Sequence, residues 1–310
     1  MFRLPIIFLA LVGGGASSHA GEPPPAAVPW TALHFEARKL ALSATSVIRR
    51  ELLPAAELAG ELREPPGKSG VPLPAWVVQL SVETDLPVGR DERVSVWLHP
   101  GTFAALQTDK RTFGRRPYVK LLRYSPGGYY EWRRAPADER EALRPPHDWS
   151  ALREGWAGET QGAAAEIVVA DPYALLYIVS AAQLQLPRRS LTAWIVSRGR
   201  LVKLAFADSG LTRRQVDHLE TWTGGERRRR ADALVRLVRV SAAASGGEEA
   251  HEPVEMGFLG MQDGLTIALD ATSGIPLELS GRARTVGSLV VRLTRAELSS
   301  PPQPQAASRP

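Results

Sequence analysis

The residue types that most often perform catalysis are sparse and widely spaced in this chain. Outside the first 20 residues, histidine occurs only as His34, His99, His147, His218 and His251, and cysteine does not occur at all. The sequence contains no His-Glu-x-x-His pattern and no histidine pair one helical turn apart, which are the spacings that zinc sites use. The sequence therefore predicts no metal site and no cofactor.

One short stretch, His147-Asp148-Trp149-Ser150, contains the residue types of a hydrolytic triad. Neighbours within one turn cannot adopt the relay geometry, which brings separate chain segments together. After two prolines, Asp148 and Ser150 are predicted to be turn or capping residues instead. The chain also lacks a Gly-x-Ser-x-Gly elbow and a phosphate-binding loop. We predict no catalytic residue and no enzyme; a hydrolase would need a cleft that joins His218 or His99 to a carboxylate and a hydroxyl.

The sharpest run of charge is Gly-Gly-Glu-Arg-Arg-Arg-Arg, residues 224–230. Clustered arginines bind anionic lipid head groups and the phosphates of lipopolysaccharide, which is one interpretation. In a chain that uses arginine freely, four arginines at the boundary of a strand are more often a solvated loop. We favour the solvated loop.

The first 20 residues have the organisation of a secretory signal peptide. Arg3 precedes an apolar run, residues 4–12, and Ser18 and Ala20 place small residues three and one positions before a cleavage site. The run is shorter than the roughly 20 residues of a membrane-spanning helix. We predict cleavage after Ala20, a periplasmic location and no integral membrane segment after cleavage. Export also argues against a nucleic acid as partner.

Proline-rich composition marks both flanks of the remaining chain. Residues 21–29 and 299–310 have few large apolar side chains and are predicted to be a disordered linker and a disordered tail. Between them, apolar residues alternate with polar ones in short blocks bounded by Gly, Pro, Asp and Ser. We predict a single β-rich domain over residues 30–298, held together by core burial because no disulfide is available.

Several blocks predict individual strands and hairpins. Residues 76–84 form one strand, residues 93–109 form a strand, a turn at Pro100-Gly101 and a return, and residues 231–243 form another strand. Residues 118–134 predict a hairpin around Ser-Pro-Gly-Gly, and residues 191–207 predict one around Arg198-Gly199.

The closing stretch, residues 267–298, alternates most regularly. Turns at residues 271–274 and 286–287 divide it into three strands that share one apolar face and one charged face. This pattern suits a sheet that wraps around a core or a cavity. It predicts a scaffold and carries no catalytic chemistry.

One helix is clearly predicted in the middle of the chain. Asp171 is a suitable N-cap and Pro172 a suitable first residue, after which Ala174, Leu175, Ile178, Val179 and Ala182 line one stripe. The helix should pack on the sheet as a lid or plug. Residues 53–63 and 136–144 are predicted to form short surface helices.

The mid-chain helix and the closing strands together resemble a family of bacterial exported proteins classified as a domain of unknown function. The matching residues are Asp171, Pro172, Asp270, Gly274, Pro276, Gly287 and Ser288. The resemblance covers residues 171–298. This family is loosely similar to the half-barrels of periplasmic lipoprotein carriers and receptors, in which a curved sheet holds acyl chains beneath a few helices. The resemblance implies that fold and a hydrophobic ligand, and no catalytic residue.

Together these observations predict a mainly β protein: a curved antiparallel sheet or incomplete barrel with one packed helix and a few short helices. We expect a periplasmic, non-enzymatic protein that binds or shields a hydrophobic ligand such as an acyl chain. The expected ligand-binding residues are a lid of Leu175, Ile178 and Val179, and a wall of Trp194, Leu277, Leu279, Leu289 and Val291. The alternative is an envelope assembly protein with a packed core that pairs with a protein partner through a sheet edge.

Overall fold

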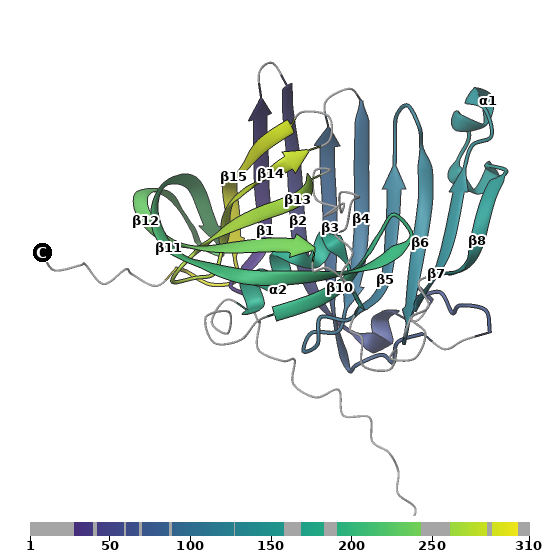
Figure 1. The fold of residues 1–310 in the computed structure, drawn as a ribbon, viewed down its shortest axis with the longest axis horizontal. Helices are drawn as coiled ribbons and strands as arrows, with labels where there is room; N and C mark the ends of the chain where they lie inside the picture. Colours follow the sequence, from purple (N-terminus) through teal and green to yellow (C-terminus); the bar gives the residue numbers. More distant parts are fainter. Residues whose placement is uncertain are drawn as a thin grey trace, which may run out of the picture.

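The protein is mainly β, and its strands form one curved sheet with few helices (Figure 1). The computed structural model describes residues 28–302 except 40–41, 59, 68–69, 87–88, 127, 158–168, 183–190, 243–260 and 284–286. This architecture confirms the predicted fold class. The predicted signal peptide lies outside the described residues, as do most of the predicted linker and residues 303–310 of the predicted tail.

The first half of the chain is an antiparallel meander of eight strands, each paired with the one before it. The strands are β1 (Trp30–Lys39), β2 (Leu42–Pro54), β3 (Trp76–Leu86), β4 (Arg90–Leu98), β5 (Ala105–Thr112), β6 (Tyr118–Ser125), β7 (Gly128–Ala135) and β8 (Ala151–Ala157). Single helical turns interrupt it: η1 (Ala55–Leu58) follows β2, and α1 (Glu139–Ala142) and η2 (Pro146–Asp148) follow β7. The meander begins at the centre of the whole sheet and ends at its edge, β8.

The second half returns from the opposite edge to the centre. Its strands are β9 (Val169–Ala170), β10 (Leu191–Ser197), β11 (Arg200–Trp222), β12 (Gly225–Ala242), β13 (Met261–Asp270), β14 (Pro276–Ala283) and β15 (Gly287–Leu298). Antiparallel pairing of β15 with β1 joins the halves, with Trp30 opposite Leu298. A further parallel pairing of β15 with β11 closes strands β11 to β15 into a ring that is not a regular barrel.

The predicted hairpins are confirmed. Ser125 pairs with Gly128 at the end of β6 and β7, and Ser197 pairs with Arg200 at the end of β10 and β11. In the second turn Arg198 and Gly199 have φ values of 49° and 80°. Two positive φ values in a two-residue loop are what a type I′ turn requires, so glycine suits this position. Residues 76–84, 93–109 and the described part of 231–243 also lie in β3, β4 to β5 and β12 as predicted.

The three closing strands are also confirmed, as β13, β14 and β15. Leu277 and Leu279 are buried, while Glu278 between them bonds Arg292 across to β15, with 3.2 Å between Oε2 and Nε. The turn before β14 depends on Asp270, whose Oδ1 accepts hydrogen bonds from the backbone N–H groups of residues 272 and 273 at 3.0 and 2.8 Å. One side of these strands therefore faces the core and the other carries charge.

The two predicted surface helices turned out differently. Within residues 136–144, α1 is a short helix whose N-cap, Asp138, accepts a hydrogen bond from the backbone N–H of Glu141. The helix predicted over residues 53–63 is wrong for most of its length. Leu53 and Pro54 complete β2 by pairing with β3, and among the described residues of this stretch only the single turn η1 follows. Strand pairing overrode the local helix propensity here.

One hydrophobic cluster extends through both halves of the sheet and around a buried helix. It includes Val78, Leu80 and Val82 from β3 and Val235, Val238 and Val240 from β12. The opposite face of the first meander carries a second, smaller cluster beneath η1, made by Leu58, Val77, Trp97 and Leu106. Period-two alternation sends neighbouring residues of β3 to the two different clusters.

Candidate functional site

The buried helix that fills the concave side of the sheet is the candidate site. It begins with the turn η4 (Pro172–Ala174) and continues as α2 (Leu175–Ala182). Asp171 is the N-cap, as predicted, and its side chain accepts a hydrogen bond from the backbone N–H of Tyr173. The predicted apolar stripe is too narrow, because every residue of α2 except Ala181 is buried. A helix that is apolar on all sides must be covered on all sides.

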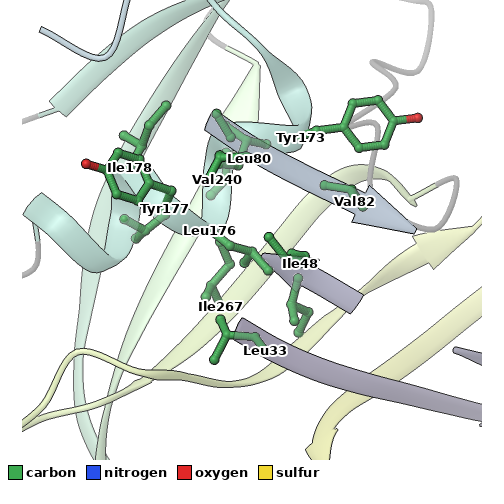
Figure 2. Close-up of a cluster of buried hydrophobic side chains, with 14 of the residues drawn as sticks. Leu33, Ile48, Leu80, Val82, Tyr173, Leu176, Tyr177, Ile178, Val240 and Ile267 are labelled. Carbon is green, nitrogen blue, oxygen red and sulfur yellow. The ribbon is translucent and has the colours of Figure 1, made fainter. Parts of the chain in front are cut away.

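The side chains of α2 meet residues from both halves of the chain. Figure 2 shows Leu176, Tyr177 and Ile178 in one cluster with Ile48 of β2 and Ile267 of β13. The ring of Tyr177 also packs edge-on against two aromatic rings, Trp30 at 6.3 Å and Phe103 at 5.9 Å between centroids. The helix therefore packs against strands from both halves of the sheet.

Polar contacts fasten the beginning of this helix to the sheet. Asp171 Oδ2 accepts hydrogen bonds from Thr108 Oγ1 at 2.6 Å and from Tyr124 Oη at 3.0 Å. Burial raises the pKa of Asp171 above its ordinary value, and these hydrogen bonds, with the one from the Tyr173 backbone, offset part of that rise. The buried carboxyl group thus has a donor for each of its oxygens.

A second polar group beside it holds Tyr173. Its hydroxyl group lies 2.6 Å from Lys110 Nζ and 3.0 Å from Glu92 Oε2, and those two charged atoms are 2.9 Å apart. Burial alone lowers the pKa of Lys110, but Tyr173 and Glu92 outweigh that effect and raise it. The ammonium group is thus held in its charged form.

The end of α2 is fastened by one serine. Ser180 Oγ donates to the backbone oxygen of Gly274 at 2.6 Å and accepts from Trp30 Nε1 at 3.1 Å. These bonds connect the helix to β1 and to the turn before β14. The helix is therefore held by hydrogen bonds at its two ends and by apolar packing between them.

The structure brings all eight predicted ligand-binding residues to one cluster. The lid residues Leu175, Ile178 and Val179 are buried in it, as are Leu277, Leu279 and Val291 of the wall, while Trp194 and Leu289 pack against it partly exposed. Their role towards a ligand stays a prediction. Sequence analysis missed Leu176 and Tyr177, which lie on the other sides of the helix. The signal that could have indicated them is that residues 175–179 are all apolar or aromatic, which is typical of a helix buried on every side.

A charged cluster lies where the ring of strands closes. His218 is 1% exposed, and its Nε2 lies 3.3 Å from Glu220 Oε1. Arg227 Nη2 lies 2.5 Å from Glu220 Oε2, and Arg229 bridges Glu220 at 3.5 Å and Asp270 at 2.6 Å. Burial alone raises the pKa of Glu220, but hydrogen bonds from His218 and Arg227 and their charge lower it to about 2.

This cluster corrects the prediction for the arginine run, which lies within β12 rather than in a solvated loop. Arg228 and Arg230 both pair with Asp217 on β11, at 2.5 and 2.9 Å. With Arg227 and Arg229 on Glu220, every arginine of the run has a carboxylate within 4 Å. The arginines of this run therefore form ion pairs with carboxylates of the neighbouring strand β11.

The stretch His147-Asp148-Trp149-Ser150, considered above as a hydrolytic triad, forms a turn and not a catalytic triad. Ser150 Oγ donates to Glu141 Oε1 at 2.7 Å, and the exposed His147 lies beside Asp148. Hydrogen bonds from the backbone of Ala137 and from Ser150 lower the pKa of Glu141 to about 2, so these residues cap the turn after α1. In the described parts of the chain, no three His, Asp or Glu side chains are grouped to hold a metal ion.

None of the helices in the described residues combines the length and the apolar character needed to cross a membrane. No protein-family model, curated protein or solved structure matches the chain. The resemblance to exported half-barrel proteins therefore stays a prediction.

Proposed function

We propose that this is an exported, periplasmic, non-enzymatic protein that shields a hydrophobic ligand such as a lipid acyl chain. In this proposal α2 fills the apolar site when no ligand is bound, and an acyl chain displaces the helix from that site. The observation that carries the proposal is the burial of α2, an almost wholly apolar helix, against the concave side of a curved sheet.

The free energies of the exchange are comparable. Burying one methylene group stabilises by about 0.8 kcal/mol, so an acyl chain of about 15 carbons gains roughly 12 kcal/mol. The large side chains of α2, residues 175–179, each contribute about 1.5–3 kcal/mol by burial, or roughly 8–15 kcal/mol together. An acyl chain can therefore offset the exposure of the helix.

The two ends of the helix are fastened unequally, which favours release from one end. The Asp171 end has hydrogen bonds from Thr108, Tyr124 and its own backbone, reinforced by the Tyr173 contacts. The far end has only the two bonds of Ser180 in the described residues. We therefore place the hinge at Asp171 and the opening at Ser180.

A single introduced thiol tests this exchange, because the chain has no cysteine of its own. In Ser180→Cys, a thiol reagent should react slowly without ligand, since Ser180 is 3% exposed. Reaction should accelerate by at least about tenfold when vesicles or micelles supply acyl chains, if opening takes the helix out of the cluster. The measurement is the labelling rate followed by intact mass.

Ser46→Cys is the matched control, since Ser46 is 1% exposed but belongs to β2, where its hydroxyl group bonds Thr84 of β3 at 2.9 Å. Its labelling should stay slow with and without lipid. Native mass spectrometry of protein taken from the periplasm, with lipid extraction, should detect a bound lipid. Slow labelling of Ser180→Cys at saturating lipid, together with a ligand-free mass, would rule out the proposal.

The second candidate is an assembly protein of the envelope, and the free edge of the sheet favours it. Among the described strands β8 pairs only with β7, and the side chains of Ala151 to Glu154 are exposed. An exposed edge can add a strand from a partner. A ligand-free protein that captures an extended peptide on β8 would support this function instead.

A further inference from the structure

The face of the sheet opposite α2 carries a concavity of about 410 Å³ that the acyl proposal does not use. In β5, Thr108 and Lys110 point to Asp171 and Tyr173, so the intervening positions face the other way. Arg111 on this other face lies beside Val119 and Arg134 in direct register across β5, β6 and β7. The lining residues are Arg63, Arg111, Val119, Trp132, Arg134, Pro146 and His147.

The backbone of Arg63 is fixed at the rim by two side chains of the same sheet face. Its N–H donates to Gln107 Oε1 at 2.8 Å, and its carbonyl oxygen accepts from Arg123 Nε at 3.1 Å. Arg123 is almost completely buried and also donates to the backbone oxygen of Leu106 at 2.6 Å. The loop that carries Arg63 is therefore anchored where its side chain meets the concavity.

Trp132 holds two guanidinium groups in place. The Arg63 and Arg134 guanidinium carbons lie 5.0 and 5.4 Å from the centroids of Trp132 rings, within the range of a cation–π interaction. Arg134 Nη1 also donates to the backbone oxygen of His147, which ties the strand to the turn η2. These contacts organise the arginines before any ligand arrives.

The charge of these arginines is only partly compensated. Neither Arg63 nor Arg134 has a carboxylate within 4 Å among the described residues, and Arg134 Nε is buried there without a hydrogen-bond partner. Arg111 pairs with Asp109 at 3.6 Å, and the charge of Asp109 also acts on Arg63. Arg227 to Arg230 of β12, by contrast, each have a carboxylate partner. The concavity therefore combines fixed geometry with an excess of positive charge, three arginines against one carboxylate.

We propose that this concavity binds a phosphate group. A phosphate carries several oxygens and up to two negative charges, and the planar guanidinium fork matches it with paired hydrogen bonds. The phosphate ester of a lipid head group and a soluble phosphate share this chemistry. The site does not depend on the proposed acyl function, because it lies on the opposite face of the sheet.

Binding to two probes tests the site and separates the sources. The first probe is inorganic phosphate, titrated by calorimetry at low ionic strength; the second is phosphatidylcholine vesicles with and without phosphatidic acid, in a sedimentation assay. Arg134→Gln and Arg63→Gln should each weaken binding by about tenfold or more, the loss of a charge-assisted hydrogen bond. Arg63 is exposed, so its variant should fold even if Arg134→Gln does not.

Arg213→Gln is the control, because it removes the same charge from an exposed pair with Asp232 on β11 and β12. It should leave binding within about twofold of wild type, as expected for a distant surface charge. Binding of both probes supports a general phosphate site, and binding of phosphatidic acid vesicles alone assigns it to lipid. The proposal is overturned if neither probe binds, or if Arg213→Gln weakens binding as much as Arg63→Gln.

Discussion

At the scale of single residues, Glu220 has the most demanding surroundings. Its side chain is 2% exposed, and it faces His218, Arg227 and Arg229. Burying a carboxylate is costly unless positive charges and donors surround it. Burial alone raises its pKa, but His218 and Arg227 outweigh burial and lower the pKa from 4.5 to about 2, so the folded protein binds this proton less tightly than the unfolded chain does.

We expect Glu220→Gln to lower the free energy of unfolding at neutral pH by roughly 3 kcal/mol, the equivalent of that pKa difference. The stabilisation by Glu220 is complete above about pH 4.5 and is lost as the pH falls towards 2. The difference between wild type and variant should therefore shrink over this interval. Urea unfolding at a series of pH values measures it.

Asp232→Asn provides the comparison, since Asp232 pairs with Arg213 on the exposed surface. It should cost less than about 1 kcal/mol at neutral pH, as exposed ion pairs do. If Glu220→Gln and Asp232→Asn lowered the free energy of unfolding by the same amount, the ion pairs of Glu220 would not stabilise the fold more than an exposed pair does.

The sequence showed the arginines of β12 but could not show their partners. Arg228 and Arg230 meet Asp217 only because the register of β11 and β12 places Asp217 opposite Arg230. Register depends on the turn and on the pairing of whole strands. The same holds for the outward concavity, whose arginines come from β5, β7 and the loop after η1.

At the scale of elements, the N-cap of the buried helix has a larger role than that of α1. Asp171→Ala leaves three donors without an acceptor inside the protein, and should lower the free energy of unfolding by about 2–4 kcal/mol. Asp138→Ala removes an exposed cap and should cost about 0.5–1 kcal/mol. Thermal and urea unfolding give both values.

Asp171→Asn removes the charge and keeps one of the two acceptor oxygens. The amide oxygen can still accept from Thr108 and Tyr124, but the amide NH2 cannot accept from the Tyr173 N–H, so only part of the stability lost in the alanine variant should return. Because burial raises the pKa of Asp171, ionisation of this carboxyl group destabilises the fold as the pH rises above its ordinary value of 3.8. As the pH rises above 3.8, the free energy of unfolding of the asparagine variant should therefore increase relative to that of wild type. A difference that does not change with pH would contradict a raised pKa of Asp171.

Alternation and turn residues predicted most strands because each hairpin is local. Residues 118–134 and 191–207 carry their own turn signals, and both form the expected pairs. The prediction of a helix over residues 53–63 was mostly wrong because Leu53 and Pro54 pair with strand β3. The N-cap of α2 was predictable, whereas its burial on every side depends on packing against both halves of the sheet, which no local pattern reveals.

At the scale of the whole molecule, one apolar cluster joins both halves of the sheet, so we expect one cooperative unfolding transition. Leu80→Ala in β3 and Leu279→Ala in β14 remove fully buried side chains from distant parts of this cluster. Each should lower the free energy of unfolding by about 2–5 kcal/mol and shift the same transition. Calorimetry and circular dichroism should agree on its midpoint.

Independent halves would behave differently. Each substitution would then move only one of two transitions and leave the other at its wild-type temperature. The exposed Leu234→Ala in β12 should change neither, and it controls for the loss of a leucine as such.

The seam between β1 and β15 has a consequence for biosynthesis. Trp30 is opposite Leu298, so the central strand of the finished sheet gains one of its two neighbours only when almost all of the chain has been made. The early strands can pair with one another in order as they emerge, because their contacts are local. The other side of β1 remains an open template for aggregation until β15 arrives. A nascent chain of this protein thus has reason to need a chaperone at that edge until synthesis passes residue 298.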